Sequence, residues 1–282
     1  MLYILYNGLS KSGKNQKNLD ELVEIVKKDN KEYVMKNIIE IKNCGEFLQT
    51  VKEDDEAVIV GGDGTVHHVA NQLQKYLPLK QNLYLFAAGT GNDFVRNIHK
   101  PVKQLVRIND YLNDLPTLTV NGEDFVFVNG AGMGVDALVC AGVNAGNNEK
   151  KSAYTMITLK SFLTYKPCDM DIEIDGEIHH FKKCWVCCAM NGECQGGGMP
   201  FAPGAEVDKV DLDFLCLHSC GRLKTLFIFM HLIGGGKHLK FKKNVFYKKA
   251  KEIKVVSAKE LPLQKDGETV DNVKEMRVKV KG

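Results

Sequence analysis

Apolar and polar residues alternate in two different ways along the chain, and the first pattern covers residues 1–117. Short apolar segments there predict β-strands at residues 2–6, 33–38, 57–61 and 83–88. Segments with apolar residues at helical spacing predict helices at residues 17–28, 44–51, 66–76 and 102–112. Because strands and helices take turns, this part of the chain is predicted to be an α/β domain with a parallel sheet.

The second pattern starts near residue 117 and consists mostly of short strands. These are predicted at residues 117–120, 125–129, 170–174, 178–181, 185–190 and 210–217. Turn dipeptides such as Asn121-Gly122 and Asp175-Gly176 separate them, and the latter is typical of a hairpin. Two helices are expected as well, at residues 152–165 and 222–233. We therefore predict a second domain, rich in antiparallel strands, over residues 118–282.

Two glycine-rich turns follow the third and fourth predicted strands. The first is Gly61-Gly62-Asp63-Gly64-Thr65, and the second is Gly89-Thr90-Gly91-Asn92-Asp93. Glycine lets the backbone approach phosphate oxygens without a Cβ clash, and the helix after the first turn directs N–H groups toward an anion. Because parallel strands end at one edge of a sheet, the two turns predict a phosphate site, where Asp63 could hold Mg²⁺ or accept a proton. The structural alternatives are a turn capped by Asp63 and a short helix capped by Asn92 or Asp93.

Composition places the chain among ordinary globular proteins. Its 282 residues are 44% apolar and 26% charged, and its net charge of +3 gives no sign of a nucleic-acid partner. The first apolar run is too short for a signal peptide, and no apolar stretch reaches the length of about 18 residues that a membrane span needs. Nine cysteines, an odd number, favour reduced thiols and a cytoplasmic protein.

Two cysteine pairs have spacings that also occur in metal and redox sites. Cys184 and Cys187 are three residues apart within a predicted strand, where such residues face opposite sides. No second pair of matching spacing accompanies them, and Cys216 with Cys220 gives no stronger pattern. A core strand is therefore favoured over a metal site for both pairs.

Three carboxylates follow a glycine- and proline-rich segment. Asp208, Asp211 and Asp213 lie within six residues, which could form an oxygen-ligated divalent cation site. Charges at a solvated turn and strand end are the alternative interpretation.

A lysine-rich segment near the C-terminus suggests contact with an anionic surface. Residues 237–254 contain eight lysines and one acid, interspersed with Phe241, Phe246 and Tyr247. Such a segment could lie on an anionic membrane, where each lysine contributes on the order of 1 kcal/mol. A solvated face of a β-hairpin is the alternative.

The N-terminal turn nearly matches a P-loop. Gly8, Gly13 and Lys14 have the required spacing, but Asn15 stands where the pattern has the Mg²⁺-binding Ser or Thr. A basic turn near phosphates is therefore favoured over a true P-loop, and an inert surface turn is the remaining possibility.

Four segments in order resemble the soluble bacterial diacylglycerol kinase family, which shares its catalytic domain with sphingosine and ceramide kinases. They are the two glycine turns, the segment from Asn191-Gly192 to Asp213, and Asp266-Gly267-Glu268. Residues 128–137 are similar to the mid-chain glycine segment of that family, and the turn at Asn7 to Lys14 is similar to its opening motif. The resemblance spans essentially the whole chain. It implies an N-terminal nucleotide-binding α/β domain and a C-terminal antiparallel β-sandwich.

The resemblance also implies roles for individual residues. The ATP site would be formed by Asn7, Lys14, Gly61, Gly62, Gly64, Thr65, Gly89, Thr90, Asn92 and Asp93. Asp63 would lie beside Mg²⁺ and the triphosphate, with Lys14 paired to Asp63 and Asp93. Asp208 and Asp213 would bind a second, structural Mg²⁺. Asp211, which the family pattern does not include, could be a compensating ligand or merely an exposed residue. Glu268 would deprotonate the lipid hydroxyl, although the sphingosine kinase branch of the family favours the aspartate at the position of Asp63.

The expected function is ATP- and Mg²⁺-dependent phosphorylation of a membrane lipid, most simply diacylglycerol, at a peripheral anionic membrane surface. The protein would be cytoplasmic and peripherally membrane-associated, and the family often forms homodimers. Some residues depart from the family pattern: His67-His68 replaces Asn-Glu, and Lys209-Val210 replaces Asp-Gly. The rival hypotheses are a sphingoid or other lipid kinase, an NAD kinase-like enzyme, and a nucleotide or membrane sensor without catalysis.

Overall fold

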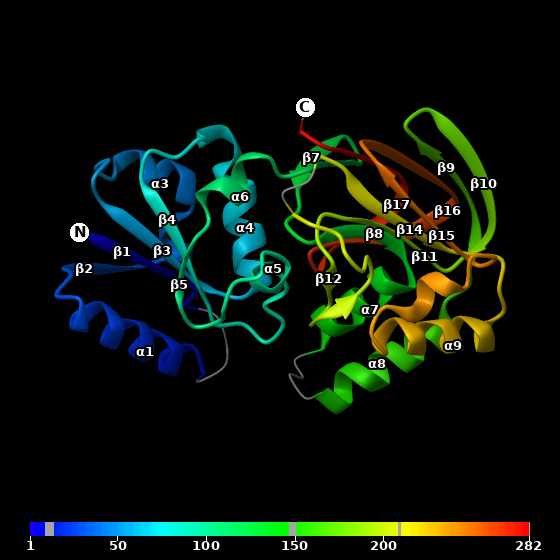
Figure 1. Ribbon diagram of the computed structural model, residues 1–282, viewed down its shortest axis with the longest axis horizontal. Coiled ribbons are helices and arrows are strands. Elements are labelled where there is room, and N and C mark those ends of the chain that lie inside the picture. Colours follow the sequence, from blue (N-terminus) through cyan, green and yellow to red (C-terminus); the bar gives the residue numbers. More distant parts are fainter. Residues whose placement is uncertain (9–13, 147–150, 208–209, 282) are drawn as a thin grey trace. The chain divides into compact units, whose positions relative to one another are not determined.

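The computed structural model describes residues 1–8, 14–146, 151–207 and 210–281, which form two compact units (Figure 1). The units are Met1–Leu115 and Pro116–Gly282. The change of hydrophobic pattern in the sequence falls at residue 117, two residues inside the second unit. Within the described residues, no helix combines the length and the apolar character that crossing a membrane requires.

The first unit is built on a five-stranded sheet in the order β2-β1-β3-β4-β5. Its strands are β1 (Leu2–Tyr6), β2 (Tyr33–Asn37), β3 (Glu56–Gly61), β4 (Asn82–Ala87) and β5 (Leu105–Arg107). The first four are parallel, as predicted, and β5 is antiparallel to β4. The helices are α1 (Lys14–Lys28), α2 (Ile38–Ile41), α3 (Cys44–Thr50), α4 (Asp63–Leu73), α5 (Asp93–Asn97) and α6 (Asn109–Asn113), with a 3₁₀ turn at Gln74–Tyr76.

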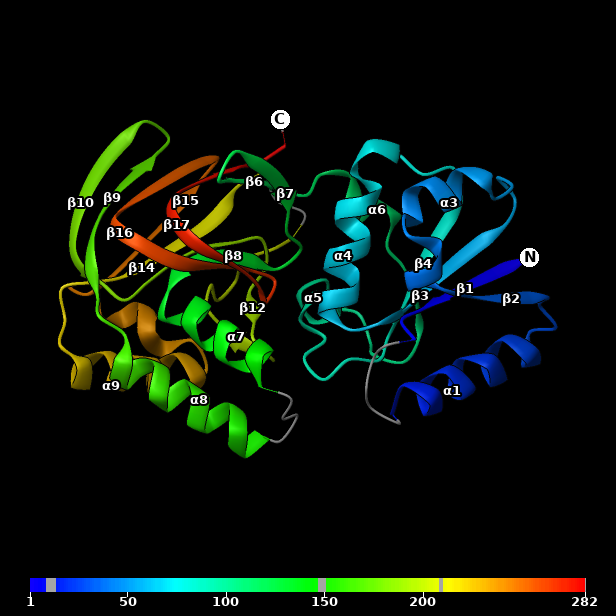
Figure 2. The same ribbon diagram turned by 180° about the vertical axis from the view of Figure 1, so that it is seen from behind.

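Alternating strand residues face helices on opposite sides of this sheet. Leu2 and Ile4 pack with Leu22 of α1 on one face. Tyr3, between them, packs against Phe47 of α3 on the other face, with ring centroids 5.5 Å apart. Seen from behind in Figure 2, α1 lies on one side of the sheet and α3 and α4 lie on the other. The carboxyl ends of β3 and β4 remain at one edge, where the two glycine turns begin.

The helix predicted at residues 102–112 is wrong. The structure has β5 followed by the short helix α6, because Val106 and Ile108 are buried while Arg107 between them is exposed. That alternation has the period of a strand, and pairing with β4 fixes it.

The second unit contains a ten-stranded sheet in which every pairing is antiparallel. Its strands are β6 (Thr117–Val120), β7 (Glu123–Val126), β8 (Gly130–Gly134), β9 (Cys168–Ile174), β10 (Glu177–Cys184), β11 (Val186–Met190), β14 (Leu212–Leu217), β15 (Val245–Ala250), β16 (Glu252–Lys265) and β17 (Glu268–Lys279). A small separate sheet pairs β12 (Cys194–Gln195) with β13 (Met199–Pro200). The helices are α7 (Val135–Ala145), α8 (Lys151–Thr164) and α9 (Arg222–Ile233), with a 3₁₀ turn, η2, at Lys237–Lys240.

The sequence did not predict strand β8 or helix α7. The five residues of β8, Gly-Ala-Gly-Met-Gly, have low strand propensity, yet all are buried between β11 and β16. A Cβ added at Gly132 would lie 2.5 Å from the Cys188 sulfur, so only glycine lets the strands approach this closely. Packing by neighbouring strands therefore overrides the local propensity of this segment.

The hairpin turns follow the sequence. Asn121-Gly122, Asp175-Gly176 and Asp266-Gly267 each place both residues at positive φ, and each joins two antiparallel strands. This is the backbone that two-residue hairpins need, and Asn or Asp followed by Gly adopts it readily.

Candidate active site

The first glycine turn joins β3 directly to helix α4. Gly62 precedes the first helical residue, Asp63, so the helix starts three residues earlier than its apolar pattern predicts. The Thr65 side chain folds over Gly61, where an added Cβ would lie 2.5 Å from the Thr65 hydroxyl oxygen. The early start of α4 places the N-terminal end of the helix directly at the end of β3, which favours an anion there.

The second glycine turn touches the first. A Cβ at Gly62 would lie 2.8 Å from the Gly89 Cα, and one at Gly89 would lie 2.5 Å from the Gly62 Cα. Asn92, with φ of +52°, holds the second turn with its side-chain amide. It accepts a hydrogen bond from the Gly89 N–H at 2.9 Å and donates one to the Gly89 carbonyl at 2.8 Å. The two predicted phosphate turns thus form one continuous backbone surface.

Asp63 links the two turns through its side chain. Its Oδ1 accepts a hydrogen bond from the Phe94 N–H at 2.9 Å, within the first turn of α5. Asp93, which begins that helix, is buried and lies 3.9 Å from the Arg96 guanidinium. The structure therefore gathers the predicted residues of both turns, and Asp63 has a capping role in addition to any role toward a ligand.

We expect Gly62→Ala to separate the two turns. The added Cβ meets backbone rather than a flexible side chain, so we expect a loss of about 1–3 kcal/mol in unfolding free energy. Thermal melting measures this loss. Gly221→Ala is the matched control, because a Cβ there meets nothing within 4 Å. Equal melting temperatures for the two variants would contradict the close contact.

The N-terminal part of the predicted site lies largely outside the described residues. Residues 9–13 of the near-P-loop are among these, and Lys14 is the first residue of α1. Asn7 follows β1 and is partly buried. The pairing of Lys14 with Asp63 and Asp93 stays a prediction.

His67 and His68 have local partners within α4. The His67 ring is buried, with Nε2 3.4 Å from the Asn71 side-chain nitrogen, and Asn71 also donates to the His67 carbonyl. The exposed His68 ring lies 2.9 Å from the Gln72 side chain. These contacts, one helical turn apart, give both histidines a structural role in the helix.

In the second unit, Asp266 anchors the hairpin that carries Glu268. The Asp266 carboxylate accepts N–H groups from Val128 at 2.8 Å, Asn129 at 2.8 Å and Gly130 at 3.2 Å. Asn144 of α7 donates to the Gly267 carbonyl at 2.9 Å. The sequence assigned no role to Asp266 beyond its place in the Asp-Gly-Glu motif. The carboxylate in fact fixes the hairpin against the glycine segment, and Glu268 follows as an exposed side chain at the start of β17.

Lys265, just before this turn, is an additional buried charge that the sequence did not indicate. Its side chain is only 8% exposed, and its ammonium lies 4.4 Å from the centroid of the Phe125 ring. Burial lowers the pKa of Lys265, while Glu268 and Asp266 act in the opposite direction. The neighbourhood of Glu268 thus contains a cation held close to the protein interior.

Asp136, in the glycine segment, is partly buried and lies next to the same hairpin. Its Oδ2 accepts from the Cys188 thiol at 3.2 Å and from the Gln264 amide at 3.3 Å, and its Oδ1 has no hydrogen-bond partner among the described residues. Burial raises the pKa of Asp136. Gln264 also accepts from the Gly267 N–H at 3.1 Å. Hydrogen bonds from Asp136 through Gln264 to the Gly267 N–H therefore stabilise the turn at Asp266-Gly267.

The acidic segment does not offer a simple magnesium site in the described residues. Asp213 is buried on β14, where its Oδ1 accepts the Tyr247 hydroxyl at 2.5 Å and its Oδ2 lies 3.8 Å from the Lys249 ammonium. A carboxylate already neutralised in this way fits a hard cation poorly. Asp208 lies outside the described residues, and Asp211 is partly exposed. Metal binding by these three aspartates stays a prediction.

Comparison with known proteins identifies both units. Residues 1–116 match the diacylglycerol kinase catalytic domain, and residues 129–280 match the YegS C-terminal NAD kinase beta sandwich-like domain. The protein YtlR of Bacillus subtilis, which carries a provisional lipid-kinase name, is 27% identical over 237 residues, covering 75% of this chain and 73% of that protein. The diacylglycerol kinase of the same organism is 23% identical over 223 residues, covering 77% and 72%. A crystal structure of a Bacillus anthracis protein, provisionally named a diacylglycerol kinase, shares the fold, with a TM-score of 0.70, 23% identity and coverage of 99% and 92%.

Proposed function

The chain belongs to the lipid kinase family that these two domains define, and we propose that it transfers the γ-phosphoryl group of ATP to the hydroxyl of diacylglycerol, giving phosphatidic acid. The observation that carries the proposal is the contact between the two glycine turns at Gly62 and Gly89, which leaves bare backbone at the start of helix α4. A surface without Cβ atoms at a helix N-terminus suits a polyphosphate.

The residues of the first unit would bind and orient the triphosphate. Backbone N–H groups at Gly62 to Gly64 would contact phosphate oxygens, with Thr65 and Asn92 bordering the site. Asp63 is a carboxylate in the first of these turns and would hold Mg²⁺, which when bound neutralises charge on the phosphates. Its hydrogen bond to the Phe94 N–H fixes the carboxylate against the second turn.

Glu268 is the better candidate for the general base. It is exposed at the start of β17, on a turn fixed by Asp266, whereas Asp63 already accepts a backbone hydrogen bond. In the proposed step the lipid hydroxyl oxygen forms a bond to the γ-phosphorus, and the bond from that phosphorus to the ADP oxygen breaks. The hydroxyl proton passes to Glu268.

An exposed apolar face on helices α8 and α9 supports a lipid substrate. Seven of the thirteen large apolar side chains exposed in the described residues lie there: Met156, Leu159, Leu163, Leu223, Phe227, Met230 and Ile233. The helices lie side by side in both ribbon views, and Phe162 of α8 packs on Phe229 of α9 with ring centroids 4.7 Å apart. Apolar side chains gathered on adjacent helices commonly mark a membrane or partner contact.

Lysines on the same helices and on the turn η2 favour an anionic membrane. Lys160 and Lys224 lie on the same two helices, and Lys237 and Lys240 follow on η2. Phe241, from the lysine-rich segment, packs on Phe227 of α9 with ring centroids 5.8 Å apart. The α8–α9 face therefore combines apolar insertion with attraction to anionic headgroups.

We expect the double substitution Leu223→Asp and Phe227→Asp to weaken vesicle binding by at least about tenfold. Burial of a large apolar side chain contributes about 1.5–3 kcal/mol, and that gain is lost when aspartate replaces it. Co-sedimentation with phosphatidylglycerol vesicles measures the effect. Ile178→Asp on β10 is the matched control, since Ile178 is 60% exposed but lies away from these helices. Equal loss in the control would contradict the assignment of this face.

A substrate panel tests the proposed function directly. The chain would be incubated with γ-labelled ATP, Mg²⁺ and vesicles that carry diacylglycerol, monoacylglycerol, a sphingoid base or a polyprenol, with NAD in a separate sample. We expect label in phosphatidic acid. Label in another lipid would replace diacylglycerol as the substrate, and label in NAD would identify an NAD kinase. ATP binding without transfer to any acceptor would favour the sensor hypothesis.

A further inference from the structure

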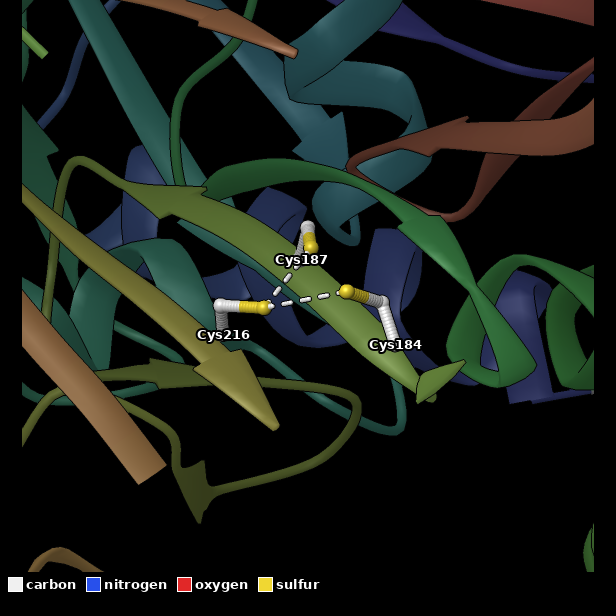
Figure 3. A group of neighbouring side chains, drawn as sticks. All are labelled: Cys184, Cys187 and Cys216. Atoms are coloured by element: carbon white, nitrogen blue, oxygen red, sulfur yellow. Dashed lines mark hydrogen bonds between the residues drawn. The ribbon is translucent and has the colours of Figure 1, made fainter. Parts of the chain in front are cut away.

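Three cysteine thiols converge in the core of the second unit, away from Asp266 and Glu268. Cys184 ends β10, Cys187 lies on β11 and Cys216 lies on β14, and their three sulfur atoms are all within 4.8 Å of one another (Figure 3). The Cys187 and Cys216 sulfurs are 3.2 Å apart, and the Cys216 and Cys184 sulfurs are 3.8 Å apart. All three side chains are buried.

The expectation that Cys184 and Cys187 face opposite sides of a strand is wrong. The strand is not continuous, because β10 ends at Cys184 and β11 begins at Val186. Lys183 has φ of +51°, and the pairing of β10 with β9 shifts register between Phe181 and Cys184. This irregularity turns the Cys184 sulfur toward Cys187. Cys216 arrives from the neighbouring strand, since it is the direct partner of Cys187 in the β11–β14 pairing.

A fourth sulfur completes the cluster. Met170 of β9 is buried, and its thioether sulfur lies 3.4 Å from the Cys187 sulfur. Outside the four sulfurs, the hydrogen bond found for these thiols is a weak one, from Cys184 to the Phe181 carbonyl at 3.6 Å. Within the described residues no carboxylate or imidazole joins the group that could hold an ion. The donor set is therefore sulfur alone.

We propose that Cys184, Cys187 and Cys216 bind a monovalent copper ion, with Met170 as a weaker fourth ligand. Thiolate and thioether sulfurs are soft ligands that select Cu(I), whereas structural zinc takes four ligands drawn from cysteine, histidine and carboxylate. A metal–sulfur distance of about 2.3 Å places three trigonal sulfurs about 4 Å apart. The Cys184 and Cys216 sulfurs already have this separation, and Cys187 needs to shift by less than about 1 Å.

Each thiol that binds the ion as thiolate releases its proton to solvent, and the copper keeps its oxidation state. The site joins three strands of the sheet, so the bound ion should raise the melting temperature of the second unit. It does not depend on the proposed phosphoryl transfer, because none of its residues belongs to the glycine turns or to the hairpin of Glu268.

An anaerobic copper titration of the full chain tests the proposal. The protein is kept reduced with a non-thiol reductant, and Cu(I) is supplied as its complex with a coloured chelator. We expect the wild type to withdraw one equivalent from the chelator and to show copper-edge X-ray absorption from a sulfur-only shell. Failure of the wild type to withdraw copper would overturn the proposal, and so would a shell that contains nitrogen or oxygen. Displacement of the copper by equimolar zinc would overturn the assignment of the metal.

Variants locate the site. We expect Cys187→Ala and Cys216→Ala each to lower the copper affinity at least tenfold, and Met170→Leu to lower it several-fold while keeping the volume of the core. Cys44→Ala is the matched control, because Cys44 is equally buried but lies on α3 of the first unit. Unchanged affinity in the cysteine variants, or a loss in Cys44→Ala, would contradict the site. Should the alanine variants fail to fold, Met170→Leu and the wild-type spectrum decide the matter.

Discussion

Asp63→Asn should reduce turnover about 10²–10³-fold while leaving the first unit folded. The substitution removes the negative charge that would hold the metal beside the phosphates, and a single electrostatic contact of this kind has an effect of that size. It keeps a side-chain oxygen in the place of Oδ1, so the hydrogen bond from the Phe94 N–H can persist. Steady-state kinetics and the melting temperature measure the two effects separately.

Asp63→Ala is the companion variant, because it removes the charge and the capping oxygen together. We expect it to lose activity as Asp63→Asn does and, in addition, about 1 kcal/mol of stability. If both variants had the melting temperature of the wild type, the hydrogen bond between Asp63 and the Phe94 N–H would contribute nothing to the stability of the first unit. If Asp63→Asn retained wild-type turnover, the metal-side role would be refuted.

Glu268→Gln should reduce turnover about 10²–10⁴-fold and leave ATP affinity intact. A glutamine cannot accept the hydroxyl proton, and general-base catalysis accounts for a factor of this size. Its side chain has nearly the same shape, and the turn that carries it is held by Asp266 rather than by Glu268 itself. Single-turnover kinetics with labelled ATP, together with calorimetric ATP binding, separate the chemical step from binding.

Asp271→Asn is the matched control for Glu268→Gln, since Asp271 is an exposed carboxylate on the same strand three residues further on. It should keep wild-type turnover. If Glu268→Gln lost ATP affinity but kept residual turnover, Glu268 would be assigned to nucleotide binding and no longer to the role of general base. In that case Asp63 would again be the candidate base.

The order of most elements up to helix α9 could be predicted from the sequence because hydrophobic periodicity and turn chemistry agree there, whereas strands β15, β16 and β17 were not among the predicted elements. Helix α9 begins and ends where its pattern does, and the turns predicted at Asn121-Gly122 and Asp175-Gly176 are confirmed. The predictions failed where packing decides. Strand β8 contains three glycines whose place in the sheet is decided by the neighbouring strands, and β5 forms by pairing with β4, the last of the four parallel strands.

In the candidate site, too, some features follow from the local sequence and others depend on packing. That the two glycine turns share an edge follows from the parallel strands that end there, but the contact of Gly62 with Gly89 depends on the exact path of both turns. The hydrogen bonds from three distant N–H groups to Asp266 could not be predicted, because the residues next to Asp266 in the sequence do not indicate a partner so far away in the chain. The approach of the Cys184 and Cys187 sulfurs could not be predicted either, because it depends on an irregularity that ends β10 at Cys184.

The hydrogen bonds of Asp266 also bear on the order in which the protein folds. Asp266 and Asn129 are 137 residues apart in the chain, so the hairpin that presents Glu268 is anchored only when a large loop has closed. Contacts of such long range form slowly and late. During synthesis, which proceeds from the N-terminus, the first unit with its proposed nucleotide site can fold while the proposed base is still within the ribosome. The proposed ATP site would therefore form before the proposed base is in place.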